Sequence, residues 1–266
     1  MIFQEKLEKR IRKVNSLLCV GLDSDFEKIP DRFRDTKFPQ FEFNKWIIEQ
    51  THEYVSAYKP NTAFYEARGE QGIKELKMTL EYLRDQHPGI LLIADAKRGD
   101  IGSTSVQYAA SLFEEFGFDA ATVNPYGGKD SIEPFLKFTE KGVIVWCKSS
   151  NPGARDFQDK IADGLPLWQH VAKAVINEWN ARNNCMLVMG ASYPTDMKKA
   201  RELAGDMVFL VPGIDTQGGK AREVVKAGLN SKGRGLIINA SRSIIFAADP
   251  KKAAQNLRDE INRFRS

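Results

Sequence analysis

The stretch Leu91-Leu92-Ile93-Ala94-Asp95-Ala96-Lys97-Arg98-Gly99-Asp100 combines an apolar run with a charged ending. Its first four residues are apolar without alternation, which is typical of a parallel strand covered on both faces. Apolar side chains then recur at intervals of three and four up to Gly117, which predicts an amphipathic helix with a glycine stop. The apolar positions of that helix are Val106, Ala109, Phe113 and Phe116. One strand followed by one helix is therefore the local pattern.

The same pattern recurs along the whole chain. Apolar runs without alternation predict eight strands, at residues 17–23, 57–64, 91–96, 120–124, 143–148, 186–191, 207–211 and 236–239. Helical patterns lie between them, and the last one opens with Asp249 as N-cap and Pro250 as first helical residue. Eight strand–helix units predict a (β/α)₈ barrel rather than an open doubly wound sheet. With 266 residues and no linker, we expect a single barrel domain over residues 1–266.

Composition excludes several classes of protein. Hydrophobic residues make up 42% and the net charge is only +4, so the chain can bury a full core and has no sign of a nucleic-acid-binding stripe. The three cysteines, Cys19, Cys147 and Cys185, sit in apolar runs and predict buried thiols rather than disulfides or a zinc site. Residues 1–15 are charged throughout, and no run reaches the roughly 18 apolar residues of a membrane span. We expect a cytoplasmic protein that contacts neither nucleic acid nor membrane.

Polar residues end most of the predicted strands, where this fold places its chemistry. Asp95 and Lys97 are two apart, so on an extended strand both point into the barrel mouth. Opposite charges there are costly unless paired or used, and a purely structural ion pair is the alternative. Asp100 adds a second carboxylate, and Lys59 on the second strand would complete an alternating cluster of two ammonium and two carboxylate groups. Neighbours of opposite sign would keep all four ionised at neutral pH.

Two loops predict substrate contacts. Residues 149–166 form the longest irregular stretch and follow the fifth strand, as an active-site cover would, although a tolerated surface insertion is the alternative. Gly218 and Gly219 open a helix after the seventh strand, and Arg242 follows the eighth. Phosphate sites in this fold often use those two loops. The alternative there is a plain glycine helix cap beside a surface arginine.

The third strand ending resembles the Asp-x-Lys-x-x-Asp signature of the orotidine monophosphate decarboxylase superfamily. The fuller string from Asp95 to Thr104 resembles the decarboxylase branch of longer bacterial chains with a DAKRGDIG motif. Further matches fall on separate strands in the expected order, at Gly21-Leu22-Asp23, Lys59-Pro60-Asn61, Ser150-Asn151-Pro152-Gly153-Ala154, Gln217-Gly218-Gly219 and Ser241-Arg242-Ser243. The resemblance implies decarboxylation of orotidine 5′-monophosphate to UMP with no cofactor and no metal.

The resemblance also implies a role for each matching residue. Lys97 would give a proton to C6 of the pyrimidine, Asp95 would lie beside the leaving carboxylate, and Lys59 and Asp100 would hold the charge network. Asp23 with Lys59 and Thr104 would bind the ribose, Ser150 rather than the adjacent Ser149 would read the base, and Gln217 and Arg242 would bind phosphate. It further implies a homodimer in which Asp100 and Thr104 enter the neighbouring subunit's site. Asn124, at the end of the fourth strand, has no assigned role.

Elementary chemistry agrees with these roles and leaves three rivals. Loss of CO₂ from C6 leaves a vinyl carbanion, which a fixed ammonium group can stabilise and then protonate. A magnesium-dependent sugar-phosphate decarboxylase or synthase of the same superfamily shares the signature, but Arg98-Gly99 and Lys59 favour the orotidine substrate. A Schiff-base aldolase needs a lysine of lowered pKa, whereas flanking carboxylates raise it. A non-catalytic nucleotide-phosphate-binding barrel would be expected to lose Lys97 or Asp95.

Overall fold

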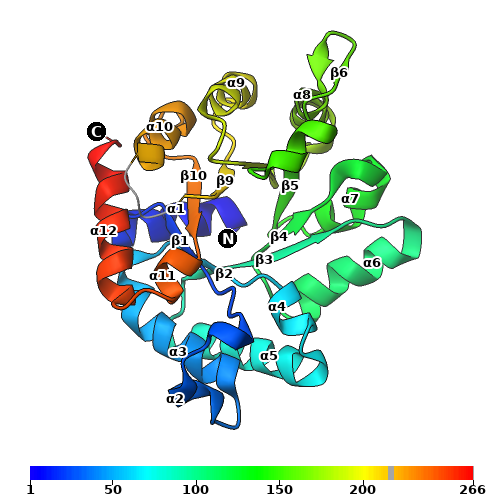
Figure 1. The fold of residues 1–266 in the computed structure, drawn as a ribbon. Helices are drawn as coiled ribbons and strands as arrows, with labels where there is room; N and C mark the ends of the chain where they lie inside the picture. Colours follow the sequence, from blue (N-terminus) through cyan, green and yellow to red (C-terminus); the bar gives the residue numbers. More distant parts are fainter. Residues whose placement is uncertain (215–218, 266) are drawn as a thin grey trace.

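The barrel is seen in a computed structural model that describes residues 1–214 and 219–265. Eight parallel strands follow one another around it in sequence order, and the last pairs with the first (Figure 1). The strands are β1 (Leu18–Gly21), β2 (Ala57–Lys59), β3 (Leu91–Arg98), β4 (Ala120–Val123), β5 (Gly142–Lys148), β8 (Cys185–Met189), β9 (Phe209–Pro212) and β10 (Leu236–Ala240). The predicted (β/α)₈ fold is confirmed.

Helices surround the strands. They are α1 (Phe3–Val14), α2 (Asp31–Arg34), α3 (Pro39–Thr51), α4 (Ala63–Glu66), α5 (Gly69–Gln86), α6 (Gly102–Ala110), α7 (Lys129–Leu136), α8 (Leu167–Ala174), α9 (Pro194–Ala204), α10 (Gly219–Gly228), α11 (Arg242–Ile245) and α12 (Pro250–Arg263). Two of them, α6 and α8, continue into single π-helical turns at Ser111–Glu115 and Val175–Trp179. The side chain of Asp249 caps α12 by accepting from the Lys252 N–H, as predicted.

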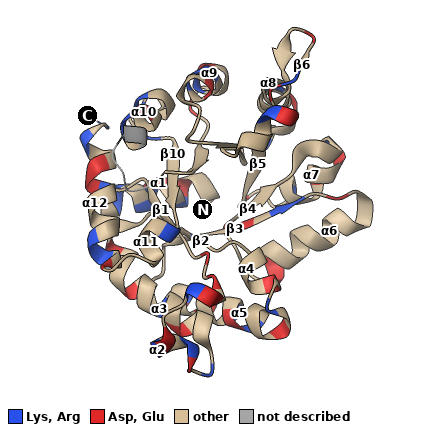
Figure 2. Ribbon diagram, in the orientation of Figure 1, with Lys and Arg blue, Asp and Glu red and all other residues tan. Residues whose placement is uncertain are grey.

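Burial explains why the strands read as continuous apolar runs. Every residue of β1, β4, β8 and β10 is buried, because side chains fill the barrel on one face and helices cover the other. Figure 2 shows the charged residues mostly on helices and loops, while β3 carries a charged carboxyl end. All three cysteines are free and buried, as expected. No helix in the described part of the chain has the length and apolarity that a bilayer crossing requires.

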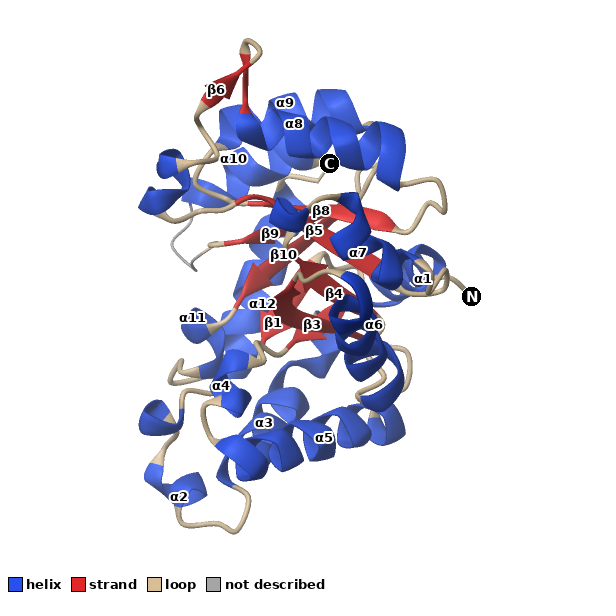
Figure 3. Cartoon of the chain, turned by 90° about the vertical axis from the view of Figure 1, so that its right-hand side faces the viewer, coloured by secondary structure: helices blue, strands red, loops and turns tan. Residues whose placement is uncertain are grey.

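Three predicted elements differ from the structure. The second strand stops at Lys59 instead of residue 64, because the chain turns at Pro60 and the Asn61 side chain accepts from the Ala63 N–H at the start of α4. Residues 149–166 are not wholly irregular, since they contain a 3₁₀ turn at Pro152–Asp156 and a small hairpin, β6 (Ile161–Ala162) with β7 (Leu165–Pro166). That hairpin projects from the body of the barrel (Figure 3).

The third difference concerns α6. Val106 was predicted on its buried face but is 46% exposed. The buried side instead runs through Ser105 and Ala109 toward Leu112. The Ser105 hydroxyl can be buried because it donates to the Ser131 carbonyl at 2.6 Å. Ser105 therefore lies on the buried side of α6, and a search for apolar residues alone does not identify that side.

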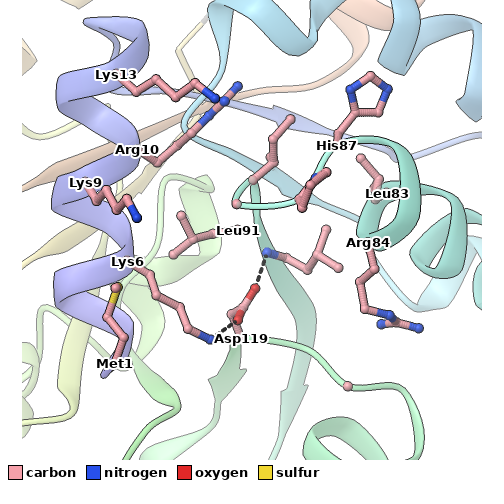
Figure 4. A pocket seen from close by; sticks show the side chains of 15 residues that line it. Met1, Lys6, Lys9, Arg10, Lys13, Leu83, Arg84, His87, Leu91 and Asp119 are labelled. Carbon is pink, nitrogen blue, oxygen red and sulfur yellow. Dashed lines mark hydrogen bonds and ion pairs between the residues drawn. The ribbon is translucent and has the colours of Figure 1, made fainter.

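Helix α1 closes the amino-terminal end of the barrel, opposite α4 and α11 (Figure 3). Its buried face includes Leu7 and Ile11, and its Arg10 guanidinium donates to the Val55 carbonyl at 3.0 Å. Between α1 and the loop that leads into β3 lies a cavity of about 490 Å³, where Lys6 pairs with Asp119 at 3.0 Å (Figure 4). Because chemistry in this fold uses the other end of the strands, this cavity is not the candidate active site.

Candidate active site

A carboxylate held between two ammonium groups lies at the mouth of the barrel. Asp95 of β3 accepts from Lys59 of β2 at 2.7 Å on Oδ2 and from Lys97 at 2.5 Å on Oδ1. Thr122 of β4 donates to the same Oδ1 at 3.2 Å, and Asn61 donates to Oδ2 at 3.5 Å. Parallel strands present their carboxyl ends at one rim, so residues from three neighbouring strands converge on this carboxylate. The fold therefore brings together three members of the predicted four-residue cluster, Lys59, Asp95 and Lys97, and no ion pair in the described residues joins Asp100 to them.

Neighbouring charges keep Asp95 and Lys59 ionised. Burial alone would raise the pKa of Asp95, but the nearby Lys59 and Lys97 ammonium groups outweigh burial and hold that pKa well below its ordinary value. Burial would lower the pKa of Lys59, but Asp95 and Asp23 outweigh it and raise that pKa above its ordinary value. With its raised pKa, Lys59 remains protonated at neutral pH, so it suits charge balance rather than Schiff-base chemistry.

The two lysines differ in exposure. The Lys59 side chain is 3% exposed, whereas the Lys97 side chain is 35% exposed. Both contact Asp95, whose side chain is 12% exposed. One ammonium group is thus sealed in the protein, and the other reaches the open mouth of the barrel.

Lys97 occupies an irregular point of β3. The register of β3 against β4 shifts between Ala94 and Arg98, and Lys97 has φ +45°, in the left-handed region that few non-glycine residues adopt. Its backbone N–H donates to the Thr122 hydroxyl at 2.9 Å instead of continuing a regular ladder. The prediction that Asp95 and Lys97 meet is right, but a bulge brings them together and not the alternation of an extended strand.

Close backbone packing supports the turn that follows. A Cβ placed on Gly99 would lie 2.7 Å from the Asn124 carbonyl oxygen, so no larger residue fits there without movement. Asn124 itself uses its side-chain Oδ1 to accept from the Tyr126 N–H at 3.0 Å. Asn124 therefore shapes the loop after β4, which is a structural role that the sequence left open.

Two buried oxygen atoms beside the cluster have no hydrogen-bond donor in the described part of the chain. They are Oδ1 of Asp23, just after β1, and Oδ1 of Asn239 on β10. Buried acceptors are normally satisfied, and a bound ligand with hydroxyl groups would supply the missing donors. Asp23 was predicted as a ribose contact, and its unpartnered oxygen agrees with that prediction.

The two serines after β5 have different surroundings. The Ser149 hydroxyl is 3.0 Å from Nε2 of Gln158, and the Ser149 backbone N–H donates to Gln158 Oε1 at 2.9 Å. Ser150 is half-buried, and the one hydrogen bond it forms within the described residues is accepted by its backbone carbonyl from the Ser192 hydroxyl at 3.3 Å. Ser149 is thus committed to the loop, which leaves Ser150 as the better candidate for a substrate contact.

Several predicted residues form no hydrogen bond or ion pair with the cluster in the described part of the chain. Asp100 makes no ion pair in the described residues, and one of its carboxylate oxygens accepts from the Ile101 N–H at 2.7 Å. Thr104, on α6, is exposed, and so is Arg242, which begins α11. Helix α10 begins at Gly219, as predicted, while Gln217 and Gly218 lie outside the described residues.

Comparison with known proteins places these residues in a family. The family model for orotidine 5′-phosphate decarboxylase / HUMPS matches residues 16–257. The orotidine 5′-phosphate decarboxylase of Cellvibrio japonicus is 48% identical over 98% of both chains, and that of Dechloromonas aromatica is 43% identical over the whole of both. The solved OMP decarboxylase of Leishmania donovani superposes with a TM-score of 0.89 at 40% identity, covering 100% of this chain and 99% of that one.

The chain belongs to the orotidine 5′-phosphate decarboxylase / HUMPS family.

Within this family framework, sequence reasoning missed three residues of the cluster. Trp146 of β5 lies with its ring centroid 5.8 Å from the Lys97 ammonium nitrogen. Thr122 contacts both Asp95 and the Lys97 backbone, and Asn239 carries one of the unpartnered oxygens. All three sit inside predicted strands. A continuous apolar run does not tell which of its residues face the barrel mouth, so the only available signal was position near a strand end.

Proposed function

We propose that this chain decarboxylates orotidine 5′-monophosphate to UMP, the step that completes UMP synthesis, through Lys97 and Asp95 and with no cofactor. The proposal rests on the Asp95 carboxylate at the barrel mouth, which pairs with the buried ammonium group of Lys59 and with the partly exposed one of Lys97. Lys59, 3% exposed, balances charge, whereas Lys97, 35% exposed, can reach a substrate atom. Membership of the family and the near full-length similarity to named decarboxylases support the same activity.

The reaction follows from that geometry. The bond between C6 and the substrate carboxylate breaks, CO₂ leaves, and the electron pair stays on C6. The Lys97 ammonium stabilises this developing charge and then donates a proton to C6, which gives UMP. Asp95 lies 2.5 Å from the Lys97 ammonium and would lie beside the leaving carboxylate. Because Asp95 stays ionised, it would repel the negative substrate carboxylate, and loss of that group as neutral CO₂ would relieve the repulsion.

Other residues would hold the substrate. The unpartnered Oδ1 of Asp23 would accept from a ribose hydroxyl. Ser150 would read the pyrimidine edge, since Ser149 is bound to Gln158. Arg242 and the start of α10 at Gly219 would bind the phosphate, with Gln217 and Gly218 from the same loop. Contacts far from C6 can stabilise closure over the reacting ring, so phosphate binding would contribute to rate.

The proposed enzyme is a homodimer. Among the described residues, no hydrogen bond or ion pair joins Asp100 or Thr104 to the cluster of their own chain, and we propose that they complete the site of the partner subunit. Ile101 and Val106, from the same segment, are 63% and 46% exposed. Exposed apolar residues of this size next to polar site residues favour burial against a second subunit. The three buried, unpaired thiols agree with a reducing, cytoplasmic location.

Absorbance measurements with purified protein test the activity. Orotidine 5′-monophosphate should lose its characteristic absorbance with or without EDTA, and Lys97→Ala should abolish the change. Turnover of a sugar phosphate that depends on magnesium would instead establish the rival enzyme of the superfamily. Binding of UMP without turnover of either substrate would establish the non-catalytic barrel.

A further inference from the structure

Lys148, the last residue of β5, is a buried cation that the proposed reaction does not use. Its side chain is 0% exposed, and its ammonium forms an ion pair with Asp159 of the following loop. A second carboxylate, Asp196 of α9, lies 3.8 Å away, and the ring centroid of Tyr193 lies 4.7 Å away. A buried ammonium is costly unless paired, so the position of Asp159 is coupled strongly to Lys148.

The loop after β5 is also cross-linked at its base. Gln158 accepts from the Ser149 N–H at 2.9 Å, and its own backbone carbonyl accepts from the Trp168 N–H at 3.0 Å. The Leu167 N–H donates to the Lys160 carbonyl at 2.9 Å. These bonds join the two ends of the loop, with the Lys148–Asp159 pair beside them. The segment between the ends, which includes Ser150, is therefore held as a closed ring.

Ser150 fits tightly against the neighbouring strand ends. A Cβ on Gly190 would lie 2.7 Å from the Ser150 nitrogen, and a Cβ on Gly213 would lie 3.2 Å from the Ser150 hydroxyl oxygen. The Ser192 hydroxyl donates to the Ser150 carbonyl at 3.3 Å. A small shift of the loop would consequently move the Ser150 hydroxyl relative to the barrel mouth.

We propose that Lys148 is a positioning residue, which sets Ser150 for substrate by holding Asp159 at the base of the loop. The inference rests on the proposed function, because it assigns a task to the substrate contact at Ser150. Asp196, 3.8 Å from the same ammonium, is a second carboxylate partner and anchors Lys148 to α9 as well as to the loop.

Asp159→Asn tests the proposal without a cavity in the core, because the Asp159 side chain is 36% exposed and the change keeps its shape. We expect kcat/KM for orotidine 5′-monophosphate to fall about 10- to 100-fold, since displacement of a substrate contact by about 1 Å has effects of this size. Asp163→Asn is the matched control, in the exposed β6–β7 turn of the same loop. Its left-handed backbone tolerates asparagine, so its kcat/KM should stay within about twofold of wild type.

A double-mutant cycle separates positioning from a general structural effect. If Lys148 and Asp159 act through Ser150, Asp159→Asn should lower kcat/KM less than about twofold further in a Ser150→Ala background. Equal fold-losses in both backgrounds, or no loss for Asp159→Asn in the active wild-type chain, would overturn the positioning role. An inactive wild type would instead refute the proposed function itself, so the two failures are distinguishable.

Discussion

Replacing Lys59 by methionine tests how much the buried ion pair between Lys59 and Asp95 contributes to the free energy of unfolding. Lys59 is 3% exposed and lies 2.7 Å from Asp95, whose side chain is 12% exposed. Removing one partner of a buried ion pair reduces the free energy of unfolding by about 3–5 kcal/mol. Lys97 still contacts Asp95 at 2.5 Å, so we expect about 3 kcal/mol, the lower end of that range. In a chain of this size that corresponds to a melting temperature lower by about 6–12 °C.

Guanidinium chloride titrations followed by tryptophan fluorescence would measure this loss, since the chain has four tryptophans. Lys77→Met is the matched control, because it breaks an ion pair with Glu115 in which the side chains are 42% and 64% exposed. Solvent screens such a pair, so the control should unfold nearly as wild type does. The reasoning is refuted if Lys59→Met and Lys77→Met lose the same free energy of unfolding.

Three further predictions follow from the same contacts. Because the pKa of Asp95 in the folded chain is held well below its ordinary 3.8, its ion pairs contribute fully above about pH 3.8, and this contribution falls progressively as the pH drops from there toward the lowered pKa. The difference in unfolding free energy between wild type and Asp95→Asn should therefore stay constant from about pH 6 to about pH 4 and shrink in urea titrations taken down to about pH 2. Gly99→Ala should lower the free energy of unfolding by about 1–3 kcal/mol in the same titration, because the added Cβ would lie 2.7 Å from the Asn124 carbonyl oxygen. An unchanged unfolding midpoint would show that the backbone around Asn124 moves aside at no cost. Mixing inactive Lys97→Ala and Asp100→Asn homodimers should recover about a quarter of wild-type activity. Random exchange of subunits makes half of the dimers mixed, and each mixed dimer has one intact site out of two. No recovery after verified exchange would place Asp100 in its own subunit's site.

The architecture could be predicted because the signal for it is redundant. The barrel strands are largely buried on both faces, so each needs only a short apolar run in its sequence, and eight such runs alternate with helical patterns. An error at one boundary leaves the topology unchanged. The sequence predicts a second strand that ends at residue 64, five residues beyond its actual end at Lys59, and the predicted order of the strands is still correct.

Smaller features were missed for separate reasons. Asp163-Gly164 between the two short strands of the β6–β7 hairpin is the typical two-residue turn sequence, with φ +48° and +79°, but the flanking strands are too short to show alternation. The π-helical turns after α6 and α8 leave the apolar spacing nearly helical, so periodicity does not reveal them. In the sequence, Trp146 is indistinguishable from the other apolar residues of its strand, because the register shift near the end of β5 is visible only in the structure.

The site was predictable in its chemical groups and not in its backbone. Charge and spacing brought Asp95 and Lys97 together, yet the contact depends on a left-handed residue at φ +45°, which carries about 1–3 kcal/mol of strain. The surroundings hold that conformation, through the bond from the Lys97 N–H to Thr122. The bulge has a consequence that an extended strand would lack. It turns the Lys97 ammonium back onto Asp95 and toward Trp146 while leaving it 35% exposed, so the strained backbone holds the proposed proton donor against its carboxylate partner and open to substrate.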